Sequence, residues 1–402
     1  MGYVRLSCAD NVLTRDIVLQ KFRSIDWSNF YDDQLLFYTR PGGLLETRQI
    51  FADLITEFTL GGHNLKNPIN PDHLAVVSGT TMILDLLGQV LFDEDDVLIA
   101  HSPFYHRFWN DFSDRGLVDI RDVPTFRPGS TDVVLDLQLY KDVYHKAVGE
   151  GRKVKAILLV NPSNPDGGYF GLDEIKPIVD WAVKEHNLFV VLDEIYDLSV
   201  YDPLEGNPFE SAIRLFDNDP SLDRDKLIWM SGVSKNFSLP GLRTAVMYTP
   251  NLKVLNATKR FLMYQGPNAT TEFIIREIIG DKTWVRDAFL PEAWQRLKKA
   301  RDNTIAFLQK LKKVSGKDLR WIKPRAGFFI MIDFSEFLPA KTFAEEKNLQ
   351  TKFVENNVLI VRGHSLSMNI PGWFRIVFSC RHWEEIEEGL RRMSTALGYH
   401  VD

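Results

Sequence analysis

The chain has 402 residues, of which 45% are hydrophobic and 25% are charged. A chain of this size and composition can bury a substantial apolar core, which excludes a mainly disordered protein. The formal net charge of −6 argues against a protein that follows nucleic-acid phosphates with a uniformly basic face.

The middle of the chain alternates short apolar strands with helical patterns. The run over residues 154–160 is almost continuously apolar, which is typical of a central parallel strand buried on both faces. The alternation predicts an α/β fold, with a doubly wound, mostly parallel central sheet. We predict strands at 74–77, 96–100, 154–160, 188–192 and 227–230, and helices over 80–91 and 173–185.

The pattern changes near residue 280, and the rest of the chain is typical of a smaller α+β domain. We therefore expect an N-terminal arm, or part of the small domain, over 1–50, a large domain over 51–280 and a small domain over 281–402. In this last region we predict helices over 284–314, 342–356 and 383–396, and strands over 327–333, 358–361 and 374–378.

In a doubly wound sheet, ligands bind at the carboxyl ends of the strands, so the loops after the strands are informative. Ser78-Gly79-Thr80-Thr81 opens a helix, where backbone N–H groups and hydroxyls can hold an anion or simply cap the helix. Two Asn-Pro steps hold Asn164 at the end of the next strand, although a rigid turn is an equal interpretation.

Three charged residues lie where burial is costly. Asp193 directly follows an apolar strand and needs a partner, unless it only caps a helix. Lys235 follows the strand at 227–230, where burial would make its amine a nucleophile; a surface lysine is the commoner alternative. Arg375 lies inside an apolar strand and requires a carboxylate, a phosphate or an internal salt bridge.

Four motifs occur together in one order along the chain. Ser234-Lys235 is followed by Pro240-Gly241 and Arg243, and upstream stand Asn-Pro-Ser-Asn164-Pro and Asp193-Glu-Ile-Tyr196. With the late arginine, Arg375, they resemble the fold-type I, pyridoxal 5′-phosphate (PLP)-dependent aminotransferases of classes I and II. Pro-Gly-Trp-Phe-Arg375 and the segment 9–13 are most similar to the 1-aminocyclopropane-1-carboxylate (ACC) synthase-like branch.

The resemblance implies a role for each motif residue. Lys235 would hold the cofactor covalently and then act as the base, while Asp193 would pair with the pyridine nitrogen. Tyr196 and Asn164 would hydrogen-bond the ring oxygen. Further expected contacts are Tyr105 stacked on the ring, the phosphate held by Gly79, Thr80, Thr81, Ser234 and Arg243, and the substrate held by Arg375, Asn164 and Asp10.

Tyr38 matches a tyrosine that reaches the partner subunit's phosphate, so the resemblance implies a homodimer with shared active sites. Three positions depart from the family pattern. Gly232 stands where a phosphate-binding serine is usual, and Asp166 stands where many relatives have threonine. Asp10 matches a glutamate of the plant synthases but is one methylene shorter.

The resemblance favours an enzyme that transfers the amino group of an α-amino acid to a 2-oxo acid. Alternatives are ACC synthase or a related carbon–sulfur lyase acting by elimination, and a catalytically silent PLP-binding or interaction protein. The loop over 265–270 has no arginine, which disfavours aspartate and glutamate as donors. A dehydrogenase is excluded because its glycine fingerprint is absent.

The cysteines and the apolar runs of the chain bear on metal binding and on where in the cell the protein is located. Cys8 and Cys380 lie near opposite ends of the chain, which gives no zinc-ligand spacing and no disulfide framework. We expect no metal site, and a reducing compartment fits this cysteine usage. The N-terminus lacks the apolar core of a signal peptide, and no apolar run approaches the roughly 18 residues of a membrane span. We expect a cytoplasmic protein that binds neither membranes nor nucleic acids.

Overall fold

The computed structural model describes residues 2–31, 33–62 and 65–401. Its large domain is built on a seven-stranded sheet with the order β2-β8-β7-β6-β5-β3-β4. All neighbours run parallel except those of β8, which is antiparallel to both β2 and β7. This confirms the predicted mostly parallel α/β sheet. The strands are β2 (Leu74–Val77), β3 (Val97–Ser102), β4 (Asp119–Pro124), β5 (Val154–Val160), β6 (Phe189–Asp193), β7 (Leu227–Gly232) and β8 (Ala245–Tyr248).

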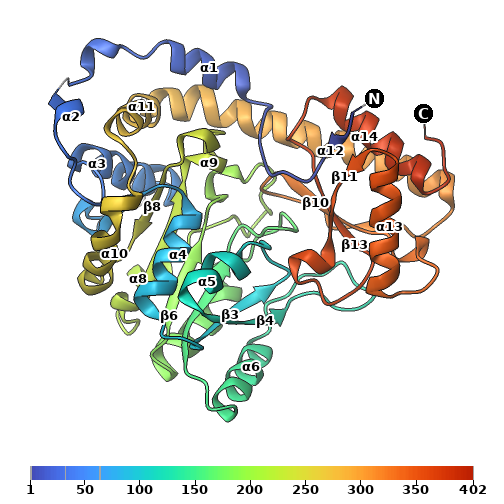
Figure 1. The fold of residues 1–402 in the computed structure, drawn as a ribbon, viewed down its shortest axis with the longest axis horizontal. Helices are drawn as coiled ribbons and strands as arrows, with labels where there is room; N and C mark the ends of the chain where they lie inside the picture. Colours follow the sequence, from blue (N-terminus) through green and yellow to red (C-terminus); the bar gives the residue numbers. More distant parts are fainter. Residues whose placement is uncertain (1, 32, 63–64, 402) are drawn as a thin grey trace.

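Helices cover both faces of this sheet, and two apolar cores result (Figure 1). Along β5, Ile157 and Leu159 enter one core, whereas Ala156 and Leu158 enter the other. Successive side chains of a strand point to opposite faces, so burial on both faces explains the continuous apolar run. The helices are α3 (Leu45–Leu54), α4 (Thr80–Leu91), α5 (Phe108–Gly116), α6 (Leu137–Gly149), α7 (Leu172–Asp180), α8 (Ile213–Asn218), α9 (Val233–Asn236), α10 (Leu252–Gln265) and α11 (Ala269–Ile279).

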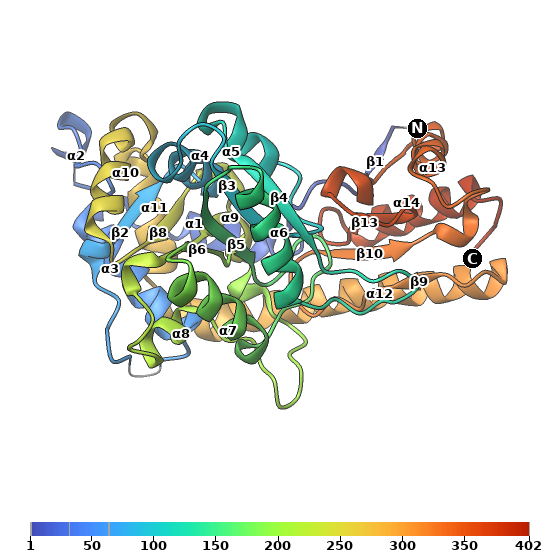
Figure 2. The same cartoon turned by 90° about the horizontal axis from the view of Figure 1, so that it is seen from below.

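The smaller domain has its own apolar core around an antiparallel four-stranded sheet, β12-β13-β10-β9. The long helix α12 runs along both domains and joins them (Figure 2). Near the N-terminus, β1 (Val4–Arg5) pairs in parallel with β11 (Val358–Leu359), which ties the start of the chain to this domain. The other elements are β9 (Arg320–Trp321), β10 (Phe329–Asp333), β12 (Val361–Arg362), β13 (Trp373–Val377), α12 (Leu290–Ser315), α13 (Phe343–Glu355) and α14 (Trp383–Ala396).

The structure refines several predicted elements. The strand expected over 358–361 is two short strands in different sheets, because Ile360 separates β11 from β12. The long helices expected over 173–185 and 284–314 each contain a π-helical turn, at Trp181–Glu185 and Trp284–Phe289. The strands β4 and β8 were not predicted. β4 carries charged residues at a sheet edge, which interrupt its apolar pattern. β8 is a buried apolar run of four residues, and periodicity does not distinguish such a short run from a buried helical segment.

Strand register brings the predicted functional loops to one edge. Val160 at the end of β5 pairs with Asp193 at the end of β6, and Asp193 pairs with Met230 in β7. Parallel strands that end together place their following loops side by side. The segment after β5, the segment after β6 and helix α9 therefore meet at the carboxyl edge of the sheet.

Candidate active site

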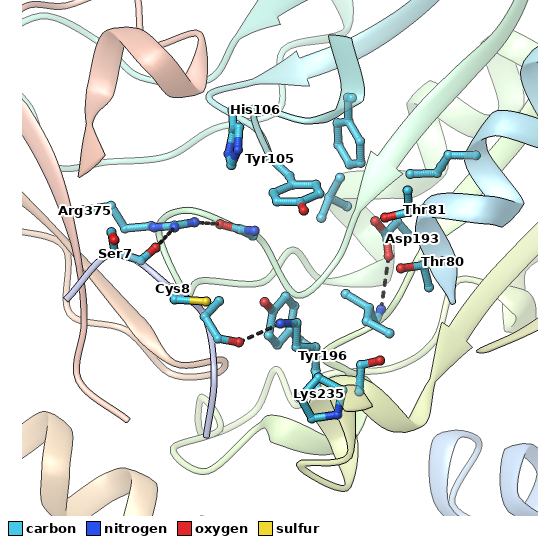
Figure 3. Close-up of a pocket in the computed structure, with 18 of the residues that line it drawn as sticks. Ser7, Cys8, Thr80, Thr81, Tyr105, His106, Asp193, Tyr196, Lys235 and Arg375 are labelled. Carbon is cyan, nitrogen blue, oxygen red and sulfur yellow. Dashed lines mark hydrogen bonds between the residues drawn. The ribbon is translucent and has the colours of Figure 1, made fainter. Parts of the chain in front are cut away.

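A cavity of about 280 Å³ opens at this edge, between the large sheet, the N-terminal segment and β13 of the small domain. Figure 3 shows side chains from these segments converging on it. Most of the residues predicted to form a site line this single cavity: Thr80, Thr81, Tyr105, Asn164, Asp193, Tyr196, Ser234, Lys235, Arg243 and Arg375.

Three predicted residues do not line the cavity. Gly79 has a φ of +95°, a backbone conformation that favours glycine, and a Cβ atom there would lie 2.5 Å from Nη2 of Arg243, so the end of this arginine would have to shift. Asp10 is half-buried, and its backbone carbonyl accepts a hydrogen bond from Oγ of Ser379 at 2.7 Å. Tyr38 is fully exposed on the segment after α2 (Asp33–Leu36).

Lys235 is placed by the immediate start of α9 after β7. Its Nζ atom donates a hydrogen bond to the carbonyl of Ala9 at 2.6 Å (Figure 3). Burial lowers the pKa of Lys235, while the nearby Asp10 opposes this shift. A lysine amine with a lowered pKa spends more time neutral, which is the form that acts as a nucleophile or base.

Asp193 is the last residue of β6 and is buried. One described hydrogen bond reaches its carboxylate, from the backbone N–H of Ile195 at 3.3 Å. Burial raises the pKa of Asp193 to about 7. No salt bridge to Asp193 occurs within the described ranges, so this carboxylate is suited to a cationic group bound in the cavity.

Arg375 projects from β13 into the cavity and is 2% exposed. Its Nη1 donates to Oδ1 of Asn164 at 2.8 Å, and its Nη2 donates to the carbonyl of Ser7 at 2.9 Å. Its Nε has no hydrogen-bond partner, and within the described part of the chain no carboxylate forms a salt bridge with it. Burial lowers the pKa of Arg375. A buried guanidinium with a free donor is suited to the carboxylate of a ligand.

An anion cradle lies at the other side of the cavity. Thr80 and Thr81 begin α4, whose first turn has no side-chain cap, and Ser234 and Arg243 line the same cavity. Backbone N–H groups at a helix start and an arginine together favour a phosphate. The departure at Gly232 from the family's serine has a steric cause, because a Cβ atom there would lie 2.9 Å from Cα of Ala245.

Asp166, the second departure from the family pattern, holds the loop that carries Asn164. Its carboxylate accepts hydrogen bonds from Oγ of Ser163 and from the backbone N–H of Gly168. Burial raises its pKa. The loop is thus held internally, with Asn164 directed towards Arg375.

Nine cavity residues were not predicted as site residues: the apolar Leu84, Phe108, Val160, Ile195 and Pro240, together with Ser7, Cys8, Ala9 and His106. Ser7 and Ala9 contribute backbone carbonyls, which no side-chain motif reveals. His106 follows Tyr105, and their ring centroids lie 5.1 Å apart. The available sequence signal was that Ala9 precedes Asp10 and His106 follows Tyr105, both of which were predicted site residues.

Metal binding and membrane spanning can both be judged over residues 2–31, 33–62 and 65–401. No group of three or more His, Cys, Asp and Glu side chains there is arranged to hold a metal ion. Within the same ranges, each helix is too short or too polar to cross a membrane.

Comparison with known proteins gives relatives across nearly the whole chain. A Mus musculus protein described as probable inactive ACC synthase-like protein 2 is 29% identical over 388 residues, covering 95% of this chain and 63% of the relative. The chain therefore spans less than two thirds of that relative's length. The ACC synthase of Nicotiana tabacum is 26% identical over 416 residues, covering 99% of this chain and 79% of the relative.

Among solved structures, the kynurenine aminotransferase of Pyrococcus horikoshii superposes with a TM-score of 0.79 at 19% identity. The match covers 99% of this chain and 91% of that structure. At this identity the likeness shows the fold, which is that of the fold-type I aminotransferases.

The cavity fits PLP on its own chemistry. The uncapped start of α4 and Arg243 suit a phosphate, the isolated carboxylate of Asp193 suits a protonated pyridine nitrogen, and the amine of Lys235 suits an aldehyde carbon. The family model for aminotransferases of class I and II matches residues 22–393. The chain belongs to the class I and II aminotransferase family, whose cofactor is pyridoxal 5′-phosphate.

Proposed function

We propose that the protein transfers the amino group of an uncharged α-amino acid to a 2-oxo acid. The observation that carries this proposal is one cavity lined by Lys235, by Asp193, whose carboxylate has no cationic partner among the described residues, and by Arg375, whose guanidinium has no carboxylate partner among them. These groups supply a nucleophile and base, a counter-ion for a cation and a site for a carboxylate.

Each proposed role derives from a side chain's surroundings. When bound, PLP supplies a ring that accepts electrons from the substrate's α-carbon. Lys235 would hold the cofactor and then take the proton from that carbon, and Asp193 would keep the ring nitrogen protonated. Tyr196 and Asn164 would donate to the ring oxygen.

The remaining proposed contacts position ligands. Tyr105, half-buried on the cavity wall, would stack on the ring. Gly79, Thr80, Thr81, Ser234 and Arg243 would hold the phosphate. Arg375, supported by Asn164, would hold the substrate carboxylate with paired donors.

Elimination, as in ACC synthase, shares the same proton removal and differs in the bond that breaks afterwards. The position of Asp10 favours transamination. Its side chain interacts with Cys8, its carbonyl is held by Ser379, and it lies outside the cavity lining. An acid with one methylene less and no place in the lining is poorly arranged to orient a γ leaving group, where a displacement of about 1 Å costs roughly 100-fold in rate.

The test is incubation of the PLP-loaded protein with a panel of amino acids and 2-oxo acids, and separately with S-adenosylmethionine. We expect exchange of the α-proton for deuterium and amino transfer from at least one uncharged amino acid, both read by mass spectrometry. Release of methylthioadenosine without transfer from any panel member would make the protein a lyase. No exchange with any member would make it catalytically silent.

We also propose a homodimer with shared sites. Exposed apolar side chains gather on and after α2 and at the end of α10, namely Leu35, Leu36, Phe37, Tyr38, Met263 and Tyr264. Such a surface is typical of a subunit interface. Tyr38, which is fully exposed and contributes nothing to its own subunit's cavity, would reach the partner's phosphate.

Subunit mixing tests the shared site. In a dimer of a Lys235→Ala chain with a Tyr38→Ala chain, one site carries both changes and the other carries neither. Random re-association should restore about a quarter of the wild-type activity, since half of the dimers are mixed and each has one intact site. Absence of recovery, with dimers demonstrated by analytical ultracentrifugation, would show that Tyr38 acts within its own subunit, and full activity of the Tyr38→Ala protein alone would show that Tyr38 has no role.

A further inference from the structure

A buried polar cluster lies directly behind the cavity and outside its lining. Its centre is the carboxylate of Asp197, which is 6% exposed. Four different segments contribute to the cluster: Thr59 at the end of η2 (Ile55–Thr59), Asp197 in η5 (Asp197–Ser199), Ser231 in β7 and Asn236 in α9.

Each oxygen of this carboxylate is engaged. Oδ2 accepts from the hydroxyl of Thr59 at 2.5 Å. Oδ1 accepts from Nδ2 of Asn236 at 2.5 Å and from the hydroxyl of Ser231 at 3.1 Å. Asn236 is held from a second side, because its Oδ1 accepts the backbone N–H of Leu198 at 3.3 Å.

The cluster joins the two segments that carry the proposed chemistry. Asp197 follows Tyr196 in the chain, and Asn236 follows Lys235. Both Tyr196 and Lys235 line the cavity, whereas their neighbours Asp197 and Asn236 lie outside the lining and bond to each other. The bond between Asp197 and Asn236 is therefore a link, one residue away, between the lysine and the tyrosine.

We propose that Asp197 is a positioning residue that fixes the amine of Lys235 relative to the hydroxyl of Tyr196. This inference rests on the proposed function, because it assumes that Lys235 binds PLP. Three neutral donors surround the carboxylate, and within the described ranges no cation forms a salt bridge with it. A buried acid satisfied only by neutral donors is a costly way to stabilise a fold, whereas several short bonds to one group define geometry well.

Loss of the carboxylate weakens the link between the two segments, because Asn236 keeps only its bonds to the hydroxyl of Ser231 at 3.1 Å and to the backbone N–H of Leu198 at 3.3 Å. In Asp197→Ala, the amide of Asn236 loses its 2.5 Å partner, and α9 has only four residues with which to resist a shift. A misplacement of about 1 Å at a reacting group costs roughly 100-fold in rate. We expect kcat to fall about 100-fold while KM for the amino acid changes by less than about threefold, because Arg375 is untouched.

Asp197→Asn separates geometry from charge. Its carbonyl can still accept from Asn236 and Ser231, and its amide can donate to the hydroxyl of Thr59, which also accepts. We expect this variant to restore kcat to within about tenfold of wild type. The matched control is Asp217→Ala. Asp217 is also buried and also accepts three hydrogen bonds, but the described donors are Lys66 and Asn67, which do not line the cavity.

The readout beyond activity is the visible absorption band of bound PLP. The pH at which this band changes reports the surroundings of the Lys235 nitrogen, so we expect the midpoint to move in Asp197→Ala and to stay in Asp217→Ala. Thermal unfolding of all variants shows whether the two alanine variants lose comparable stability. If Asp197→Ala does not fold, Asn236→Ala removes the same bond from the other side and is expected to move the same midpoint.

The two proposals fail in different ways. If borohydride links PLP to a lysine other than Lys235 in the wild-type protein, the proposed function is wrong. If Lys235 is labelled, but removing the Asp197–Asn236 bond leaves both the midpoint and kcat as they are in Asp217→Ala, the positioning role is wrong and the proposed function stands.

Discussion

The two consecutive acids at the end of β6, Asp193 and Glu194, lie on opposite sides of the active-site wall and differ in their partners. Glu194, fully buried behind the wall, accepts from Nε1 of Trp229 at 2.7 Å and from the backbone N–H of Ala212 at 2.9 Å. Asp193 faces the cavity with a single 3.3 Å backbone bond. Burial raises the pKa of both, to about 8 and about 7. The raised pKa therefore does not distinguish the two acids, whereas the number of their hydrogen-bond partners does.

The same contrast holds for two buried arginines, each 2% exposed. Every nitrogen of the Arg301 guanidinium is bonded, to Asp202, Asp302 or the carbonyl of Pro324. Arg375 keeps an unpaired Nε and lacks a carboxylate partner among the described residues. In these two pairs, the fully bonded members, Glu194 and Arg301, lie outside the cavity lining, whereas Asp193 and Arg375 line the cavity with incomplete bonding that a ligand would complete.

Removal of the cavity lysine, Lys235, should have the largest effect on activity. We expect Lys235→Ala to abolish the visible band of bound PLP and to lower activity by about 10⁴-fold, because both nucleophile and base are lost. The control is Lys226→Ala, at the other end of β7 in η6 (Arg224–Lys226), which should leave both unchanged. Comparable loss in the two variants would remove Lys235 from the site.

Substituting each of the two acids, Asp193 and Glu194, in a separate variant sharpens the comparison between them. Asp193→Ala should retain some PLP but lower the single-turnover rate of α-proton removal by about 10³-fold, since the ring nitrogen loses its counter-ion. Near pH 4.5, below the range in which the raised pKa of Glu194 costs stability, Glu194→Gln should lower the free energy of unfolding by about 1–3 kcal/mol, and it should leave that rate nearly unchanged. A loss of tenfold or less in Asp193→Ala would contradict the role of Asp193.

The two arginines provide a matched pair. Arg375→Lys keeps the charge but not the paired donors, so we expect substrate binding to weaken by about 2–3 kcal/mol, or roughly 30- to 150-fold, with PLP binding little changed. Arg301→Lys should lower the melting temperature without changing substrate affinity. Calorimetric titration and thermal unfolding measure these effects. Equal weakening of substrate binding and PLP binding in Arg375→Lys would show that Arg375 has a structural role and does not bind the substrate.

The smallest effect concerns pH. The pKa of Glu194 is raised to about 8 in the folded protein, against 4.5 as its ordinary value. Between these values the folded state holds the proton that the unfolded state releases, so this group's contribution to stability falls as pH rises from about 4.5 towards 8. Glu194→Gln should flatten that fall in denaturant unfolding measured across this range. An unchanged slope would show that Glu194 does not titrate there.

Many residues of the candidate site could be predicted from the sequence because they contribute side chains, whose type and position in the sequence are informative. The apolar run of β5, Asp193 at a strand end and Lys235 after β7 each have a local physical signature, and their loops meet because parallel strands end together. Contacts made by backbone carbonyls had no such signature, so Ser7 and Ala9 were missed.

Other features depend on packing across the fold. The need for glycine at Gly232 comes from β8, a strand that sequence reasoning did not find. The link between Asp197 and Asn236 spans 39 residues of sequence. Nothing local distinguishes such a buried acid from an ordinary helix cap, and only the folded chain shows which acids are fully partnered.

The central claim is that the incompletely satisfied groups at the sheet edge form a PLP site centred on Lys235. The direct measurement is borohydride reduction of the PLP-loaded protein, followed by digestion and mass spectrometry of the labelled peptide. The account predicts one labelled lysine, Lys235, at close to one PLP per chain. Labelling of another lysine, or no labelling of a protein that remains folded, would contradict it.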